Sequence, residues 1–200
     1  EKAREYLDTI TGMNAFITYD GRTRTYQIHN IFTNFLREIL EEKASDYKKM
    51  LHEKAGSWYF QAGDYLAAMH HFHAAGDFEK LLSVMELDKT NSITNEQQKK
   101  LLIRYFEECP QEYKQSHPIA VLAYAMALMT FNEMELFEKV TGEFLTLLQG
   151  SKLDPAQIQR LMGEFELLLS FTKYNDILEM SRHHKKACEM LKEPSAFMDT

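Results

Sequence analysis

Three histidines lie close enough along the chain to suggest a metal site. His70 and His73 are three residues apart, so they share one face if their segment is helical, and His71 lies beside them. Zinc takes three or four ligands in a fixed geometry, whereas this spacing supplies at most two. In a repeat helix such histidines more often line a groove or face solvent, so we expect no metal here.

A second set of possible ligands is no more complete. His183 and His184 are adjacent, and Cys188 follows four residues after His184. The two cysteines, Cys109 and Cys188, make neither a disulfide framework nor a four-ligand zinc site. Neither lies beside a base in a recognisable nucleophile motif. We therefore expect no metal site and no enzyme activity.

The composition is that of a helical, acidic protein. Lys and Arg total 23 against 30 Asp and Glu, a net charge of −7, in a chain of 200 residues. This balance argues against a protein built to bind nucleic-acid phosphates or an anionic membrane. Leu occurs 23 times and Val three times, which favours helices over sheets. With no apolar stretch near the roughly 18 residues of a membrane span and no signal-peptide pattern, we expect a cytoplasmic protein.

The only break in the helical pattern comes near the start, at about residues 15–29. Two runs of aromatic and β-branched residues flank Asp20-Gly21 there. Such a pattern predicts a β-hairpin with a tight turn, in which Gly21 takes a positive φ. A short amphipathic stretch precedes it, and residues 31–40 return to the helical period. Helix, hairpin and helix are typical of the end of a winged-helix module, which we assign to residues 1–44.

Binding of DNA by this hairpin would require a basic surface. Residues 1–30 hold four basic and four acidic side chains, so their local charge is zero. The electrostatic footprint of a DNA-binding module is missing. We expect Arg22 and Arg24 to be solvated residues of a structural hairpin.

The rest of the chain reads as repeated helix–turn–helix units. Gly63 is expected to end a helix, Thr94 with Gln97 forms a capping-box pattern, and Asp154 precedes Pro155 as a cap before a first-turn proline. The segment 118–130 is apolar nearly all round, which predicts a helix in the middle of the stack. The expected helices are residues 46–61, 64–75, 77–87, 95–108, 118–130, 133–148, 156–173 and 176–191.

One helix pair carries a distinctive set of small and aromatic residues, which are Gly56, Tyr59, Gly63, Tyr65, Ala68, Phe72 and Ala75. Gly56 and Ala68 would let two antiparallel helices approach closely, with aromatic rings filling the space between them. The lone Trp58 is expected in the same core. The set resembles a tetratricopeptide repeat, and the helix pairs recur at the 35–40-residue spacing of a repeat array. The sequence thus predicts an all-α fold, with a tetratricopeptide-like superhelix over residues 45–200 that is truncated at its C-terminus.

Two segments together resemble a larger family. They are YQIHNIFTNFLREIL and LHEKAGSWYFQAGDYLAAMHHFHAAGDFEKL, and they look like the junction in MalT-like, LuxR-type transcriptional regulators. The resemblance is strongest over residues 14–82. It implies a signal-transduction ATPase with a nucleotide-binding domain, a winged helix, a helical-repeat sensor and a C-terminal helix-turn-helix. The chain has no G-x-x-x-x-G-K-[ST] loop, so it would be an internal fragment without a cofactor of its own. ATP or ADP would then bind the missing upstream domain, and DNA the missing C-terminal domain.

The resemblance also singles out His29. In related signalling ATPases a histidine at a similar winged-helix position contacts the bound nucleotide, and an imidazole can donate a hydrogen bond to a phosphate without a fixed charge near pH 7. The alternative is that His29 caps the following helix or packs at the strand end. An effector groove is expected on the inner helices of the array, near Tyr59, His70 and His73.

The function that these features favour is regulatory. The chain would be the sensor segment of an ATP-dependent LuxR-type activator, coupling a small effector or a regulatory protein on the repeat face to the neighbouring nucleotide-binding domain. One alternative is a free-standing tetratricopeptide-type adaptor that binds a protein partner. Another is a winged-helix DNA-binding protein with a helical dimerisation tail, against which the zero charge of residues 1–30 counts.

Overall fold

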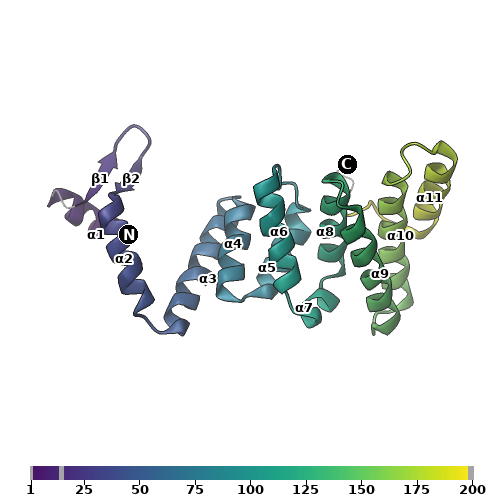
Figure 1. The fold of residues 1–200 in the computed structure, drawn as a ribbon, viewed down its shortest axis with the longest axis horizontal. Helices are drawn as coiled ribbons and strands as arrows, with labels where there is room; N and C mark the ends of the chain where they lie inside the picture. The colour runs from purple at the N-terminus through teal and green to yellow at the C-terminus, as the bar shows by residue number, and fades with distance from the viewer. Residues whose placement is uncertain (1, 14–15, 198–200) are drawn as a thin grey trace. The chain divides into compact units, whose positions relative to one another are not determined.

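The computed structural model describes residues 2–13 and 16–197, and this part of the chain is all-α with one small hairpin (Figure 1). The predicted fold class is thereby confirmed. Residue 15, the expected start of the hairpin, and residues 1 and 198–200 of the two assigned domains lie outside the described part. No helix within the described ranges is long and apolar enough to cross a membrane.

The chain divides into two compact units, with the boundary between Met50 and Leu51. The first unit contains α1 (Lys2–Gly12), β1 (Ile17–Asp20), β2 (Thr25–Ile28) and α2 (Asn30–Glu41). Helix α3 (Ser45–Gln61) crosses the boundary. The second unit continues with α4 (Tyr65–Ala75), α5 (Phe78–Asp88), α6 (Glu96–Glu108), α7 (Gln111–Ser116), α8 (Pro118–Thr130), α9 (Met134–Gly150), α10 (Pro155–Phe171) and α11 (Ile177–Met190).

The hairpin forms as expected, but its turn differs from the prediction. Strands β1 and β2 pair antiparallel with Asp20 opposite Thr25, so the four residues 21–24 form a loop that is wider than the expected tight turn. The Asp20 carboxylate accepts a hydrogen bond from the backbone N–H of Arg22 at 2.8 Å. The positive φ falls at Arg24 (55°) and not at Gly21. An aspartate that bonds the backbone two residues ahead stabilises this wider loop without a glycine in the left-handed region.

Helix α2 follows the predicted apolar period, yet none of its residues is buried. Phe32 stacks on Phe16 and on Phe35 with ring centroids about 6 Å apart. Ile31 and Phe35 nevertheless remain 65% and 53% exposed. The sequence period thus identified the apolar face of the helix but not whether the rest of this unit covers it.

In the second unit each predicted helix occurs with both ends within two residues of the expected positions. Gly63 follows α3 with a φ of 78°, and Asp154 forms the expected capping box with Gln157 at the start of α10. The predicted Thr94 cap is wrong: the side chain of Asn95 caps α6. Thr94 instead bonds Gln98, because Asn95 is one residue closer to the first free N–H groups of the helix. The short helix α7 was not expected.

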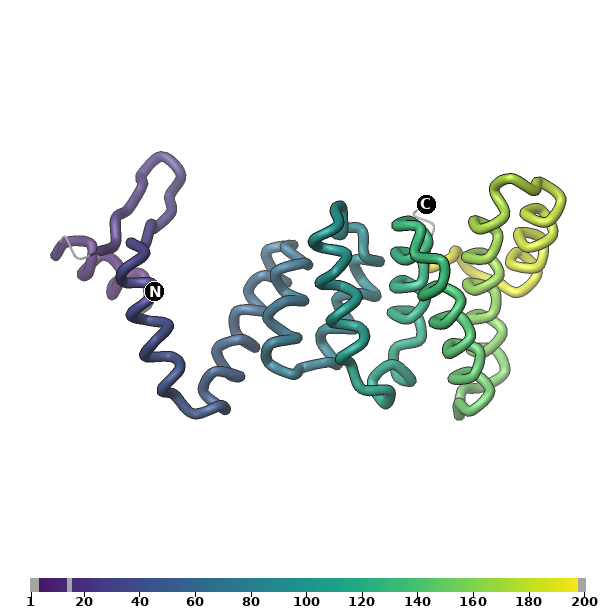
Figure 2. The backbone as a smooth tube through the Cα atoms, viewed as in Figure 1, coloured from purple at the N-terminus to yellow at the C-terminus, as the bar shows by residue number. Residues whose placement is uncertain are grey.

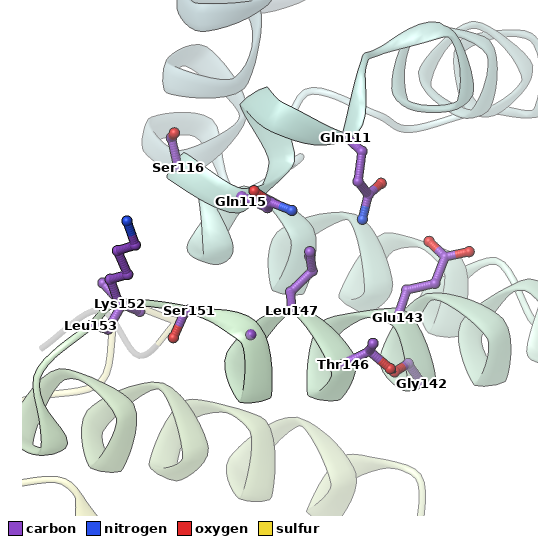
Figure 3. A pocket seen from close by; sticks show the side chains of 11 residues that line it. Gln111, Gln115, Ser116, Gly142, Glu143, Thr146, Leu147, Ser151, Lys152 and Leu153 are labelled. Carbon is purple, nitrogen blue, oxygen red and sulfur yellow. The ribbon is translucent and has the colours of Figure 1, made fainter.

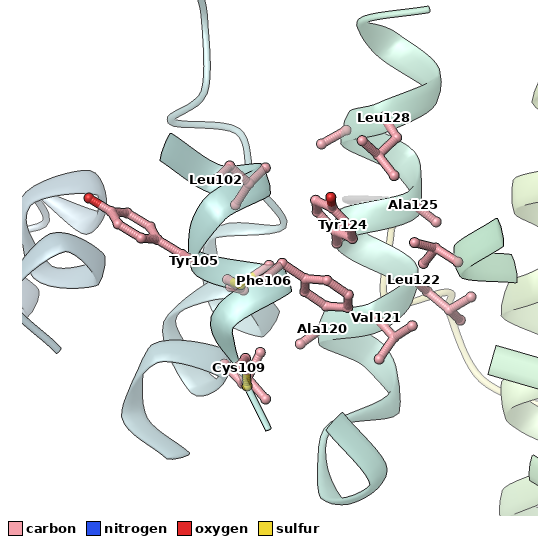
Figure 4. Packing of buried hydrophobic residues seen from close by; sticks show 14 of the residues in the cluster. Leu102, Tyr105, Phe106, Cys109, Ala120, Val121, Leu122, Tyr124, Ala125 and Leu128 are labelled. Carbon is pink, nitrogen blue, oxygen red and sulfur yellow. The ribbon is translucent and has the colours of Figure 1, made fainter. Parts of the chain in front are cut away.

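The core of this unit is centred on α8, as its uniformly apolar sequence predicts. Eight of its residues are buried, and it packs against α5, α7, α9 and α10. Figure 4 shows Phe106 of α6 facing Tyr124 of α8, and their rings stack with centroids 3.9 Å apart. Helices α3 to α10 therefore share one continuous hydrophobic core.

The last described residues fold back onto the array. After α11 the chain returns towards α8 (Figure 2). The fully buried Glu164 carboxylate of α10 accepts hydrogen bonds from the Ser195 hydroxyl at 2.5 Å and the Ala196 N–H at 2.7 Å. Phe197 packs against the core beside them. A buried carboxylate thus fixes the C-terminal segment to α10.

Candidate functional site

His29 lies between β2 and α2 and caps the helix. The side-chain Nδ1 of His29 accepts a hydrogen bond from the backbone N–H of Ile31 at 3.3 Å, and the backbone N–H of His29 donates to the Phe16 carbonyl at 2.7 Å. This is the capping arrangement that the sequence left open as an alternative. Because Nδ1 accepts, the neutral ring carries its proton on Nε2. The side chain is exposed, so Nε2 can reach a ligand without breaking the cap.

The repeat signature occupies the first helix pair of the second unit. A Cβ at Gly56 of α3 would lie 2.7 Å from Cε1 of Phe72 on α4, so the ring fills the space that a larger residue would take. Ala68 and Phe72 are buried and Ala75 is 5% exposed. The role of Gly56 is therefore structural, since it allows the Phe72 ring to pack against the α3 backbone.

The aromatic members of the signature are less buried than expected. Tyr59 and Tyr65 are only half-buried. Trp58, expected in the core, is 63% exposed and touches Tyr59 edge-on with ring centroids 4.9 Å apart. Trp58 neighbours Tyr59 in the sequence, but the face of α3 that packs against α4 contains Gly56. Trp58 lies outside that face.

Two imidazoles form a direct contact that the sequence did not suggest. Nδ1 of His52 on α3 lies 2.9 Å from Nδ1 of His71 on α4, so one ring donates and the other accepts. Tyr59 stacks on His71 with an interplanar angle of 10°. Burial, reinforced by the charge of neighbouring histidines, lowers the pKa of both His52 and His71 below the ordinary value. The two histidines lie on different helices, 19 residues apart in the sequence, so no local sequence pattern indicates that they meet.

The remaining two histidines of α4 contact α6. Nδ1 of His70 lies 3.0 Å from the Tyr105 hydroxyl, and Nε2 of His73 lies 2.8 Å from a Glu108 carboxylate oxygen. The expected groove residues Tyr59, His70 and His73 therefore each contact protein side chains. Across the described ranges no group of three His, Cys, Asp or Glu residues has the geometry to hold a metal ion.

A partly open cavity of about 870 Å³ lies instead between α7 and α9. The residues of α7 that line it are Gln111, Gln115 and Ser116. Figure 3 shows Gln111 and Gln115 lying across from the face of α9. Helix α7 is only six residues long, and its sequence gives no strong periodic signal. Sequence reasoning therefore missed this wall of the cavity.

The opposite wall is one face of α9 and the loop after it. The residues that line this wall are Gly142, Glu143, Thr146, Leu147 and Gly150 on α9, followed by Ser151, Lys152 and Leu153. Helix positions four residues apart share a face. On this face Gly142 and Gly150 have no side chain and Thr146 has a small one. Figure 3 places Glu143 and Lys152 at opposite ends of the cavity. The site is thus a groove of mixed polar and apolar lining, with a carboxylate at one end and an ammonium group at the other.

Known proteins resemble this chain at low sequence identity. No protein-family model matches it, and no solved structure gives a significant match. The chain is 23% identical over 189 aligned positions to the HTH-type transcriptional regulator MalT of Vibrio cholerae, covering 85% of the chain and 21% of that protein. This relative is named as a transcriptional regulator.

A second relative carries a different description. The chain is 26% identical over 143 positions to the serine/threonine-protein kinase PknK of Mycobacterium tuberculosis, covering 72% of the chain and 13% of the kinase. The matched region is therefore a small share of both relatives. The similarity supports a relationship to the MalT-type regulators. It covers only part of each full-length relative.

Proposed function

We propose that this chain is the regulatory and sensor segment of an ATP-dependent, LuxR-type transcriptional activator. The observation that carries the proposal is the similarity to MalT of Vibrio cholerae over 85% of the chain. In this proposal a small effector or a regulatory protein binds the helical array of the second unit. Binding then changes the state of a neighbouring nucleotide-binding domain in the parent protein.

The groove between α7 and α9 is the proposed effector site, in place of Tyr59, His70 and His73. Its volume of about 870 Å³ falls within the range of about 300–1,000 Å³ that is usual for ligand pockets. Polar side chains converge on it from two helices and the following loop. The histidines of α4, by contrast, are already engaged with His52, Tyr105 and Glu108.

His29 is the proposed nucleotide-sensing residue of the first unit. Its helix cap fixes the ring and leaves the exposed Nε2–H as a donor to a phosphate oxygen. In this proposal the chain has no catalytic residue and no cofactor of its own, and ATP or ADP binds the neighbouring domain. DNA contacts and a cytoplasmic location belong to the parent protein in the same proposal.

Transcript profiling of three matched strains tests the function. One strain carries the wild-type parent gene, one lacks it, and one carries Gln111→Ala with Gln115→Ala in the parent. We expect deletion to change a defined set of transcripts and the double variant to change the same set. If the variant accumulates normally and its transcripts match the wild type, the groove has no sensor role.

The similarity to PknK favours a second candidate, in which the segment regulates a protein kinase. The same three strains separate the two candidates. A deletion that alters the phosphorylation of proteins without a direct change in promoter occupancy supports the kinase context. A deletion that first removes the parent protein from promoters supports the transcriptional regulator.

A further inference from the structure

The groove between α7 and α9 has the length of a short extended chain. From Gly142 to Gly150 the axis of α9 advances by about 12 Å, at about 1.5 Å per residue. An extended polypeptide rises about 3.3 Å per residue, so about four residues match this length. At both ends of that span a Cβ on the glycine would meet no neighbouring side chain within 4 Å in the described chain. No side chain therefore narrows the groove at the two glycines that bound this span.

The side chains that line the groove provide hydrogen-bond donors and acceptors that are free to bind a ligand. Within the described ranges, the amides of Gln111 and Gln115 make no hydrogen bond to any protein group. Each offers a carbonyl acceptor and an NH₂ donor. The Thr146 and Ser151 hydroxyls donate to the Gly142 and Leu148 carbonyls at 3.0 and 2.8 Å, so their oxygens remain as acceptors. A peptide backbone, which alternates N–H donors and C=O acceptors, matches this set.

The two charges of the groove give it a direction. Glu143 and Lys152 lie at opposite ends (Figure 3), and neither forms an ion pair within the described part of the chain. A ligand with a cationic group at one end and an anionic group at the other would complement both. Opposite charges facing each other across a binding surface also select the orientation of the partner.

Other ligand classes fit the lining less well. Among the described residues that line the groove none is aromatic, so a nucleobase or a sugar ring has no flat face on which to stack. Lys152 is the one cation among the described lining residues, and a polyphosphate ordinarily needs several charge-assisted donors. Leu147 and Leu153 are the large apolar side chains of the described lining, and two such side chains do not enclose an acyl chain.

We propose that this groove binds an extended peptide segment of about four residues, with a basic group against Glu143 and an acidic group against Lys152. The Gln111 and Gln115 amides pair with the peptide backbone, and the charged ends set its direction. This inference rests on the proposed sensor function, because it names the class of effector that the sensor receives.

A random hexapeptide library displayed on phage is the probe, with the purified 200-residue chain as bait. We expect the selected peptides to carry a basic and an acidic residue about four positions apart. Isothermal titration of the synthesised peptides should show that Gln115→Ala weakens binding about fivefold, the usual effect of one lost hydrogen bond. Lys152→Glu should weaken it about tenfold, whereas Lys185→Glu on exposed α11 should leave it unchanged.

A double charge reversal separates direction from mere electrostatic attraction. Glu143→Lys combined with Lys152→Glu should restore binding only of the peptide whose two charged residues are exchanged. Selected peptides that bind all these variants equally would overturn the proposal. So would an oligosaccharide or a nucleotide that binds in place of any peptide and is lost in Gln111→Ala. That last result would leave the sensor function standing, since the transcript profiles test it independently.

Discussion

Replacing Gly56 with alanine tests the closest approach between the first two helices of the second unit. In a helix interior, alanine is ordinarily more stable than glycine by about 0.5–1 kcal/mol. At Gly56 the new Cβ would lie 2.7 Å from Cε1 and 2.8 Å from Cδ1 of Phe72. That ring is 2% exposed and has little room to withdraw. Overpacking of this kind costs about 1–3 kcal/mol, so we expect Gly56→Ala to lower the free energy of unfolding by about 1–2 kcal/mol.

Gly142→Ala is the matched control for this substitution. Gly142 also lies inside a helix, and its Cβ would meet nothing within 4 Å. The same chemical change should therefore stabilise the protein by about 0.5–1 kcal/mol. The opposite signs at the two glycines separate the effect of the Phe72 contact from helix propensity.

Urea unfolding followed by two signals measures both variants. Fluorescence of Trp58, the one tryptophan, reports on α3 beside the substitution, and far-ultraviolet circular dichroism reports on all helices. Two signals are needed because helical arrays can unfold in parts. Adding Phe72→Leu to Gly56→Ala should recover part of the loss. If Gly56→Ala is stabilised as much as Gly142→Ala, the close approach does not constrain the helix pair and the reasoning is refuted.

Three further predictions follow from single groups. Folding lowers the pKa values of His52 and His71, so the unfolded state binds more protons than the folded state. The free energy of unfolding should therefore fall as pH drops below about 6.5, with a slope of at most about 2.7 kcal/mol per pH unit. Replacing both histidines with glutamine should flatten this slope in urea titrations at pH 5 to 8. Glu164→Leu leaves two hydrogen-bond donors of the C-terminal segment without an acceptor and should lower the free energy of unfolding by about 3 kcal/mol. Glu164→Gln should lower it by less, and equal stability of the two variants would contradict the anchoring role of Glu164. Burial raises the pKa of Cys109 to about 11, so a thiol reagent at pH 8 should label the exposed Cys188 quickly and Cys109 only on unfolding.

The sequence alone determined the local structure of this protein. The apolar period predicts each long helix to within two residues, and Gly63 and Asp154 mark the expected helix ends. These signals are local, because a helix depends on residues three and four positions apart and on the groups that cap its ends. The small residue at Gly56 is likewise readable, since close helix packing excludes larger side chains at that position.

The tertiary structure alone decided which faces and which polar groups are available. Trp58 is exposed although its neighbours pack, and the other described residues of its own unit leave the apolar face of α2 uncovered. The His52–His71 contact joins side chains from two helices, and the groove combines a six-residue helix with one face of α9. Such features depend on how helices distant in the sequence are placed against each other. Periodicity indicates that a helix has an apolar face, but only packing determines what covers that face and where space remains between helices.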